Sequence, residues 1–340
     1  MTTPQNHNHG VGRSRLVEEI EKVMRERLGW NEIVMSNVMW RFIGVNVDEL
    51  IAYGINPHEW IEILSHISIN DPYMLGAVHG DVYVKPTSCC YEVSAHTTST
   101  TGVMYFERLM RTIKTPSVIF ATWRKKPNVI YVRFFVKIGK SEWPWYGKGY
   151  EAISSFNTSE LLRYLAGLVD TDGIVTSEKR SYGYRFEIDI TSANIEFLKH
   201  LRNIIFERLG ISGHVHVDES SKNANELRFR TWQAVQLYEE LRQYLAHPMK
   251  RLRAETYVKY YNKEVSEAEY QRFYEQFKYH HGFGDPKRYR AAILLTQAAP
   301  QTHTHGEAPI KSPRLVIKNR VKTYMKTRMK KLKACDDGDG

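Results

Sequence analysis

The chain of 340 residues, 42% of them hydrophobic and 25% charged, has the composition of a soluble globular protein and the length for two domains. It contains no run of about 18 uncharged apolar residues, so no membrane span is expected, and its three cysteines exclude a disulfide framework. The polar N-terminus has no apolar core of a signal peptide, which predicts a cytoplasmic location. The net charge of +10 comes mostly from ten basic residues between positions 308 and 335, so a nucleic-acid surface elsewhere requires basic side chains gathered on one face.

Residues 13–67 carry apolar side chains at helical spacing, which predicts an N-terminal helical extension. After residue 71, short alternating strands separate helices in an order that occurs twice. The first copy is expected to hold helices to residue 81 and at 102–113, with strands at 82–85, 91–96, 117–123 and 129–138. The second is expected to hold helices at 159–172, 194–209 and 232–245, with strands at 173–180, 182–191, 211–217 and 226–231. Ser192 and Gly210 are the expected cap residues of the helix at 194–209.

This repeat predicts an α+β fold of two αββαββα lobes related by a pseudo-twofold axis, with the helical extension before them. The expected domains are the extension at 1–70, a first repeat at 71–150, a second repeat at 151–262, and a helical segment with the basic tail at 263–340. Because one chain supplies both lobes, we expect a monomer.

A conspicuous motif ends the first helix of each copy. Tyr164-Leu-Ala-Gly-Leu-Val-Asp-Thr-Asp-Gly173 in the second copy resembles the signature of the LAGLIDADG family at almost every position. Tyr73-Met-Leu-Gly-Ala-Val-His-Gly-Asp-Val82 in the first copy matches it in register. The resemblance covers residues 71–251 and implies a homing endonuclease of the type that carries two motifs in one chain.

Small residues in both motifs allow two helices to pack with their backbones close together. These residues are Gly76 and Ala77 in the first copy and Ala166 and Gly167 in the second. Such packing around a pseudo-twofold axis would bring Asp81 and Asp172 side by side at the helix ends. Two carboxylates that close repel each other and call for a hard divalent cation, and oxygen ligands suit Mg²⁺ or Mn²⁺.

The resemblance implies that Asp81 and Asp172 are metal-binding catalytic acids, with Gly80 and Thr171 beside them in the metal site. It also implies a catalytic role for Lys250, because the segment from His247 to Lys250 resembles a family segment whose lysine points toward the active site. There the ammonium group would stabilise negative charge on phosphate. An exposed lysine at a helix start is the alternative.

Two positions of the first motif depart from the family pattern. His79 stands where the second copy has Asp170, and we interpret it as a packing or capping residue. Val82 stands where the second copy has Gly173. A β-branched residue avoids positive φ, so the first helix must end differently from the second.

The polar face of each predicted sheet is the surface available to a partner, because arginine forks bind phosphates and guanine edges and β-ribbons fit the major groove. The candidate DNA-binding residues are Lys85, Arg133 and Lys137 in the first copy and Arg185, His214, His216, Arg228 and Arg230 in the second. An ordinary solvated sheet face is the alternative for each, since Glu187, Asp189 and Glu226 share the second face. The basic tail is either a non-specific nucleic-acid contact or a solvated segment.

These features predict a sequence-specific, metal-dependent endonuclease that hydrolyses phosphodiester bonds in double-stranded DNA. The first alternative is an RNA maturase or a DNA-binding regulator that keeps the fold without cleavage, so RNA is the alternative partner. The second alternative is an interaction protein that uses the scaffold for protein contacts, with the N-terminal helices as its surface.

Overall fold

The computed structural model describes residues 45–123, 126–181, 183–217 and 225–278. They all belong to one compact unit. Within the described ranges, no helix is long and apolar enough to cross a bilayer. The basic tail at 308–335 and the part of the N-terminal extension before residue 45 lie outside the described residues.

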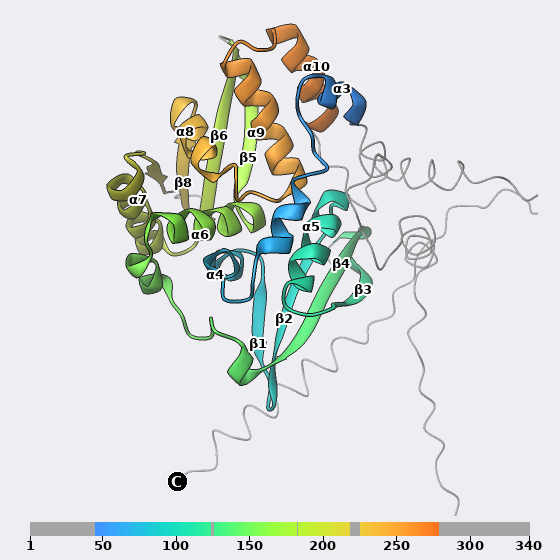
Figure 1. Ribbon diagram of the computed structural model, residues 1–340, viewed down its shortest axis with the longest axis vertical. Helices are drawn as coiled ribbons and strands as arrows, with labels where there is room; N and C mark the ends of the chain where they lie inside the picture. Colours follow the sequence, from blue (N-terminus) through green and yellow to red (C-terminus); the bar gives the residue numbers. More distant parts are fainter. Residues whose placement is uncertain (1–44, 124–125, 182, 218–224, 279–340) are drawn as a thin grey trace, which may run out of the picture. The chain divides into compact units, whose positions relative to one another are not determined.

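The described elements appear in Figure 1. The chain begins with the helix α3 (Val47–Ala52) and the 3-10 helix η1 (Ile61–His66). The first lobe contains α4 (Pro72–His79), β1 (Tyr83–Pro86), β2 (Cys90–Thr97), α5 (Thr100–Arg111), β3 (Ser117–Trp123) and β4 (Lys126–Gly139), and the 3-10 helices η2 (Lys140–Glu142) and η3 (Tyr150–Ser155) follow it. The second lobe contains α6 (Thr158–Thr171), β5 (Ile174–Arg180), β6 (Gly183–Ser192), α7 (Ile195–Leu209), β7 (His214–His216), β8 (Asn225–Arg230) and α8 (Trp232–Leu241). The helices α9 (Pro248–Tyr261) and α10 (Glu267–Phe277) come last.

Each lobe contains a four-stranded antiparallel sheet, and the two sheets share one topology. The strand orders are β1-β2-β4-β3 and β5-β6-β8-β7, so each strand has a counterpart at the same place in the other lobe. The expected α+β fold of two repeated lobes is confirmed. The lobes differ where they end: α8 closes the second, whereas η2 and η3 follow the first, because Gly139, Pro144 and Gly147 disfavour a longer helix there.

The two motif helices end differently, as expected from Val82 in place of Gly173, but the expected reason is wrong, because Gly173 does not adopt a positive φ. Glycine is required there by space: a Cβ on Gly173 would lie 2.6 Å from the Cα of Val169. The helix α4 stops at His79, and Gly80 follows it with φ −94°. The helix α6 runs on to Thr171, which is the motif position after the one where α4 stops. A prediction about α7 was wrong: Asn194, not Ser192, is its N-cap, because the Asn194 side chain accepts the hydrogen bond from Phe197 N (3.1 Å). Gly210, with φ +68°, ends α7 as expected.

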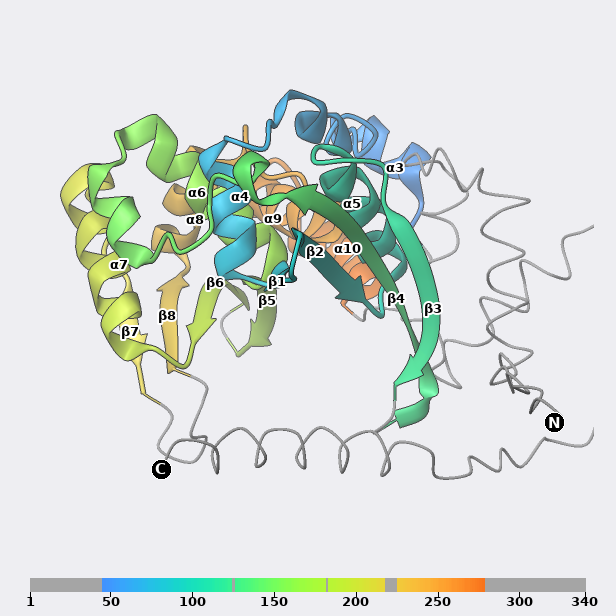
Figure 2. The same cartoon turned by 90° about the horizontal axis from the view of Figure 1, so that it is seen from below.

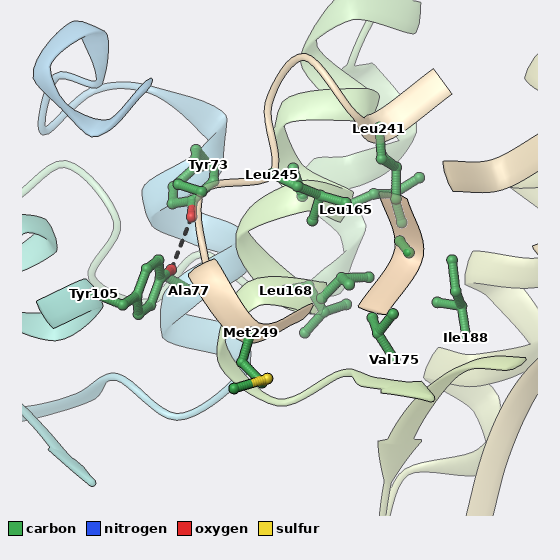
Figure 3. Packing of buried hydrophobic residues seen from close by; sticks show 14 of the residues in the cluster. Tyr73, Ala77, Tyr105, Leu165, Leu168, Val175, Ile188, Leu241, Leu245 and Met249 are labelled. Atoms are coloured by element: carbon green, nitrogen blue, oxygen red, sulfur yellow. Dashed lines mark hydrogen bonds between the residues drawn. The ribbon is translucent and has the colours of Figure 1, made fainter. Parts of the chain in front are cut away.

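The helices α4 and α6 lie against each other, and the two sheets extend on either side of this pair (Figure 2). The core lies between helices and sheets, and the inward side chains of the central strands, such as Phe134 and Phe186, are fully buried there. In Figure 3, Leu165 and Leu168 of α6 lie among side chains from β5, β6 and the α8–α9 region. The α4–α6 pair is therefore held by the cores of both lobes.

The described part of the N-terminal extension is attached to the C-terminal helix α10. The Tyr53 hydroxyl donates to Glu269 Oε1 (2.7 Å), and Arg272 forms an ion pair with Glu49 at 2.5 Å. The backbone N–H of Asn46 donates to the side chain of Gln276 (3.1 Å). The segment that precedes the first lobe is thus bound to α10, a helix that follows the second lobe.

Candidate functional site

The helices α4 and α6 cross at two glycines in reciprocal contact. A Cβ placed on Gly76 would lie 2.0 Å from the carbonyl oxygen of Tyr164, and a Cβ placed on Gly167 would lie 2.0 Å from the carbonyl oxygen of Tyr73. Real Cβ atoms do not approach backbone so closely, so both positions require glycine at this separation. Ala77 and Ala166, beside the glycines, are also fully buried. The close crossing brings the C-terminal ends of both helices together.

Asp81 and Asp172 lie at these adjoining helix ends. Asp172 is the C-cap of α6, and Asp81 follows Gly80, where a Cβ would lie 3.2 Å from the Cβ of Asp172. Burial and then repulsion from Asp81 raise the pKa of Asp172 to about 6. The Asp81 side chain is exposed, but desolvation by the surrounding protein raises its pKa. Lys250 and His96 oppose this shift in part. The two carboxyl groups are therefore close enough to interact electrostatically.

Lys250 is the cation at this junction. Its Nζ donates hydrogen bonds to the carbonyl oxygens of Val169 (2.8 Å), Asp170 (2.9 Å) and Thr171 (3.1 Å) in the last turn of α6. Burial lowers the pKa of Lys250 to about 8, although nearby carboxylates oppose this shift. An ammonium group has three donors, and here all three point at the helix end. Lys250 thus caps α6 and is not the exposed lysine of the alternative interpretation.

The donor set fits a hard divalent cation bound partly by solvent. The Asp81 carboxylate raises the proton affinity of Asp172, so a positive charge between them is favourable, and carboxylate oxygens are ligands of Mg²⁺ and Mn²⁺. No cluster of three or more His, Cys, Asp or Glu side chains able to enclose a metal occurs among the described residues. Asp81 and Asp172, with backbone at Gly80 and Thr171, could therefore hold a cation only with water or a phosphate completing its shell.

The candidate DNA-binding residues lie on one face of each sheet. In the first lobe, the register pairs Lys85 with Glu92, Glu92 with Lys137, and His96 with Arg133, and directly paired residues share a face. In the second lobe, the register places Arg185, Arg228, Arg230, His214 and His216 together on the face opposite the core. Tyr83, at the β1 edge of the first face, is 63% exposed. The two faces could contact a partner without disturbing the core.

Acidic residues neutralise most arginines on these faces. Glu187 lies 2.9 Å from Arg185 and 3.1 Å from Arg230, and Arg228 pairs with Glu226. In the first lobe, Arg133 donates to Glu92 Oε1 at 2.6 Å. The guanidinium groups are therefore oriented before any partner binds, and a phosphate or base would have to compete with a carboxylate for them.

Asp189 is the unusual acid of the second face. It is 8% exposed, its Oδ1 has no hydrogen-bond partner, and it lies across the ladder from Arg228 on β8 and Ile174 on β5. Burial, with repulsion from Glu187 and Glu226, raises the pKa of Asp189 to about 7. Alternation alone predicted its face but not its burial.

Residues 159–278 match the model of a family described as "LAGLIDADG-like domain". The second lobe belongs to the LAGLIDADG family. The match extends through α9 and α10, and the first lobe repeats the topology of this LAGLIDADG lobe and supplies the matching helix at the crossing. This agrees with the arrangement of two motifs in one chain. A search of curated protein sequences finds no match to the chain.

Several solved structures resemble the chain at low sequence identity. The homing endonuclease I-WcaI bound to its DNA recognition sequence has 13% identity and a TM-score of 0.45, over 64% of this chain and 97% of that one. I-DmoI in complex with DNA and Ca has 17% identity and a TM-score of 0.33, over 53% and 88% of the two chains. Full-length DUF199/WhiA from Thermatoga maritima has 14% identity and a TM-score of 0.37, over 78% and 73%. The LAGLIDADG assignment depends on the family match and the duplicated lobes, not on these likenesses.

The outer acid of the LAGLIDADG motif proves to be a buried anchor. Asp170 is fully buried and its Oδ2 accepts hydrogen bonds from the Tyr73 hydroxyl and from Ala246 N, each at 2.6 Å. The Tyr73 oxygen also contacts the hydroxyl of Tyr105 on α5 at 2.8 Å (Figure 3). Burial raises the pKa of Asp170 to about 6, although these hydrogen bonds lower it. Tyr73, Tyr105 and Ala246 were not predicted as site residues, and the only signal for them in the sequence is the tyrosine that opens both motifs.

Proposed function

We propose that this protein is a sequence-specific endonuclease that hydrolyses phosphodiester bonds in double-stranded DNA with a divalent metal ion. The observation that carries the proposal is the junction of Asp81 and Asp172, where the reciprocal glycine contacts bring two carboxyl groups together between the two sheet faces. A protein that only binds nucleic acid gains nothing from two carboxylates that repel phosphate. The LAGLIDADG assignment of the second lobe supports the same reaction.

Each residue at the junction has a distinct part in the proposal. Asp81 and Asp172 would bind the cation, either Mg²⁺ or Mn²⁺, with Gly80 and Thr171 beside them. When bound, such a cation activates water and stabilises negative charge on phosphate and leaving oxygens. Lys250 holds the end of α6, so that the Asp172 carboxyl is oriented, and adds positive charge where the phosphate would lie.

The sheet faces would bind the DNA on either side of this junction. The proposed contacts are Lys85, Arg133 and Lys137 in the first lobe and Arg185, His214, His216, Arg228 and Arg230 in the second. Because these side chains are spread over two sheets, we expect a recognition site of many base pairs, which a single chain could contact along its whole length. A role in homing, as the family resemblance implies, belongs to the same proposal.

The test is cleavage of a supercoiled plasmid library carrying random or genomic inserts, with Mg²⁺, with Mn²⁺ and with Ca²⁺. We expect linear product from a few inserts, dependent on Mg²⁺ or Mn²⁺, and none from Asp81→Asn or Asp172→Asn. The matched control is Asp48→Asn on the exposed side of α3, which should cut like the wild type. Cleavage that survives both aspartate substitutions would show that the site is elsewhere.

The second candidate is a binder of DNA or structured RNA that does not cleave. The first motif favours it, because α4 ends early and Asp81 lies beyond the helix, whereas Asp172 caps its own. A gel-shift or anisotropy measurement on the same library separates the two candidates. Selective binding in Ca²⁺ without cutting in Mg²⁺ or Mn²⁺ would favour the binder, and a preference for RNA would favour a maturase.

A further inference from the structure

The tyrosine at the first position of each motif contacts a residue near the C-terminal end of the other motif helix. The Tyr73 hydroxyl on α4 donates to Asp170 Oδ2 on α6 at 2.6 Å. The Tyr164 hydroxyl on α6 lies 2.9 Å from Nδ1 of His79 on α4. Tyr73 and Tyr164 occupy equivalent motif positions, and so do His79 and Asp170. The two contacts are therefore related by the same pseudo-symmetry as the glycines, although one acceptor is a carboxylate and the other an imidazole.

The second contact of each acceptor explains why a histidine can stand in the first motif. Asp170 Oδ2 also accepts from the backbone N–H of Ala246. His79 Nε2 instead lies 3.3 Å from the backbone carbonyl oxygen of Lys148, which can only accept. Nε2 therefore carries the proton and Nδ1 has the free lone pair, so the Tyr164 hydroxyl donates to it. His79 therefore accepts a hydrogen bond from its tyrosine, as Asp170 does. Its second partner is an acceptor, the Lys148 carbonyl, whereas the second partner of Asp170 is a donor, the Ala246 N–H.

Both acceptors lie close in the sequence to the carboxyl groups of the proposed site. His79 is the last residue of α4, two positions before Asp81, and Asp170 stands two positions before Asp172. We propose that the pairs Tyr164–His79 and Tyr73–Asp170 are positioning pairs, each of which holds one helix end and thereby orients one of the two carboxyl groups. This inference rests on the proposed nuclease function, since it assigns each pair to one half of that site.

The two pairs are not equally supported. Asp170 is fully buried and receives Ala246 N, while Lys250 binds the carbonyl groups at the same helix end. His79 is only partly buried, and its other contacts are the rings of Tyr150 (centroids 4.8 Å apart) and Phe197 (6.4 Å) and the carbonyl oxygen of Lys148. The Asp81 half of the site therefore depends more on its tyrosine than the Asp172 half does.

The test compares Tyr164→Phe with Tyr73→Phe on a supercoiled plasmid carrying the selected target, with nicking of each strand followed separately. Loss of one hydrogen bond changes an equilibrium by roughly fivefold. We expect each variant to slow the cleavage of one strand by about that factor. The ratio of the two strand rates should therefore change in opposite directions in the two variants, and the change should be larger in Tyr164→Phe. Tyr257→Phe is the control, because it removes another buried tyrosine hydrogen bond (to Tyr184 O, 3.1 Å) away from the helix crossing. Equal slowing of both strands in both variants, as in the control, would overturn the inference.

Two substitutions of the histidine sharpen the test. In His79→Asn the amide oxygen takes the place of Nδ1 and keeps an acceptor for Tyr164, so the wild-type strand ratio should be retained. In His79→Leu the acceptor is gone, and the ratio should shift as in Tyr164→Phe. A ratio that depends on residue volume rather than on the acceptor would contradict a positioning role.

A readout that needs no cleavage separates this inference from the proposed function. The ¹⁵N chemical shifts of the His79 imidazole report its tautomer, and we expect the proton on Nε2 in the wild type. Tyr164→Phe should shift the Nδ1 resonance, while Tyr257→Phe should not. A proton on Nδ1 would refute the positioning pair even in an active enzyme. Absence of cutting with the expected tautomer would refute the nuclease proposal and, with it, the role assigned to the pair.

Discussion

Gly76 and Tyr164 are in backbone contact: a Cβ on the glycine would lie 2.0 Å from the tyrosine carbonyl oxygen. The mirror contact between Gly167 and Tyr73 has the same length. Because the obstacle is backbone on both sides, neither helix can yield by turning a side chain. The separation of the two carboxyl groups at the helix ends is therefore set by residues one to two turns away from them.

Substituting either glycine should destabilise the fold. We expect Gly76→Ala and Gly167→Ala each to lower the free energy of unfolding by about 1–3 kcal/mol, because an added methyl group forces the helices apart. Urea denaturation measures the change. The control is Gly149→Ala, whose Cβ would meet only the flexible carboxylate of Glu151, and it should unfold close to the wild type. Wild-type stability in Gly76→Ala would show that the helices are not in backbone contact.

Lys250 should matter for stability as well as for cleavage. Lys250→Met removes the ammonium donor from three carbonyl oxygens at the end of α6, of which the Val169 oxygen keeps the backbone N–H of Gly173, so we expect a loss of about 1–3 kcal/mol in the free energy of unfolding. Lys199→Met removes an exposed ion pair with Glu196 and should cost about 0.5 kcal/mol or less. Equal stability of the two variants would mean that Lys250 does not cap the helix and acts only on a bound partner.

The raised pKa of Asp189 predicts a pH-dependent stability. Its folded pKa is about 7, whereas an unfolded aspartate has a pKa of about 4, so the folded state holds the proton more tightly between these values. Stability should therefore fall as pH rises from about 4 to about 7 and then level off. In Asp189→Asn this component should vanish, and urea denaturation across the range measures the difference. If the free energy of unfolding of the wild type minus that of the variant is constant or rises with pH, the raised pKa of Asp189 is contradicted.

The acids on the sheet faces should restrain DNA binding. Glu187→Gln releases Arg230 and leaves Arg185 with Glu178 alone (3.1 Å), so we expect tighter binding to non-specific duplex and weaker discrimination for the target. The slope of log affinity against log salt should steepen by up to about one phosphate contact. Fluorescence anisotropy at two salt concentrations measures both effects. Glu207→Gln on the exposed side of α7 is the charge-matched control, and an equal change there would indicate a general charge effect.

Local pattern in the sequence was enough to predict the architecture. The alternation of Tyr184, Phe186, Ile188 and Ile190 defines a buried strand face because side chains on a strand point to opposite sides in turn. The repeated motif, with its small residues, predicted two helices in close contact. Val82 in place of Gly173 predicted that the first helix ends differently, but the reason is the close approach of the Val169 backbone to Gly173 and not a positive φ.

Only the tertiary structure decided which side chains meet. His79 and Asp170 look like a mismatch in the sequence, but folding brings a backbone carbonyl to one and a backbone N–H to the other. Lys250 could have faced solvent, and its partners lie about eighty positions away in the chain. The arginines of the second sheet are predictable as a set, whereas their pairing with Glu187 and Glu226 depends on strand register. Periodicity and backbone preference act within a few residues, while hydrogen bonds and ion pairs depend on distances that only the packed fold defines.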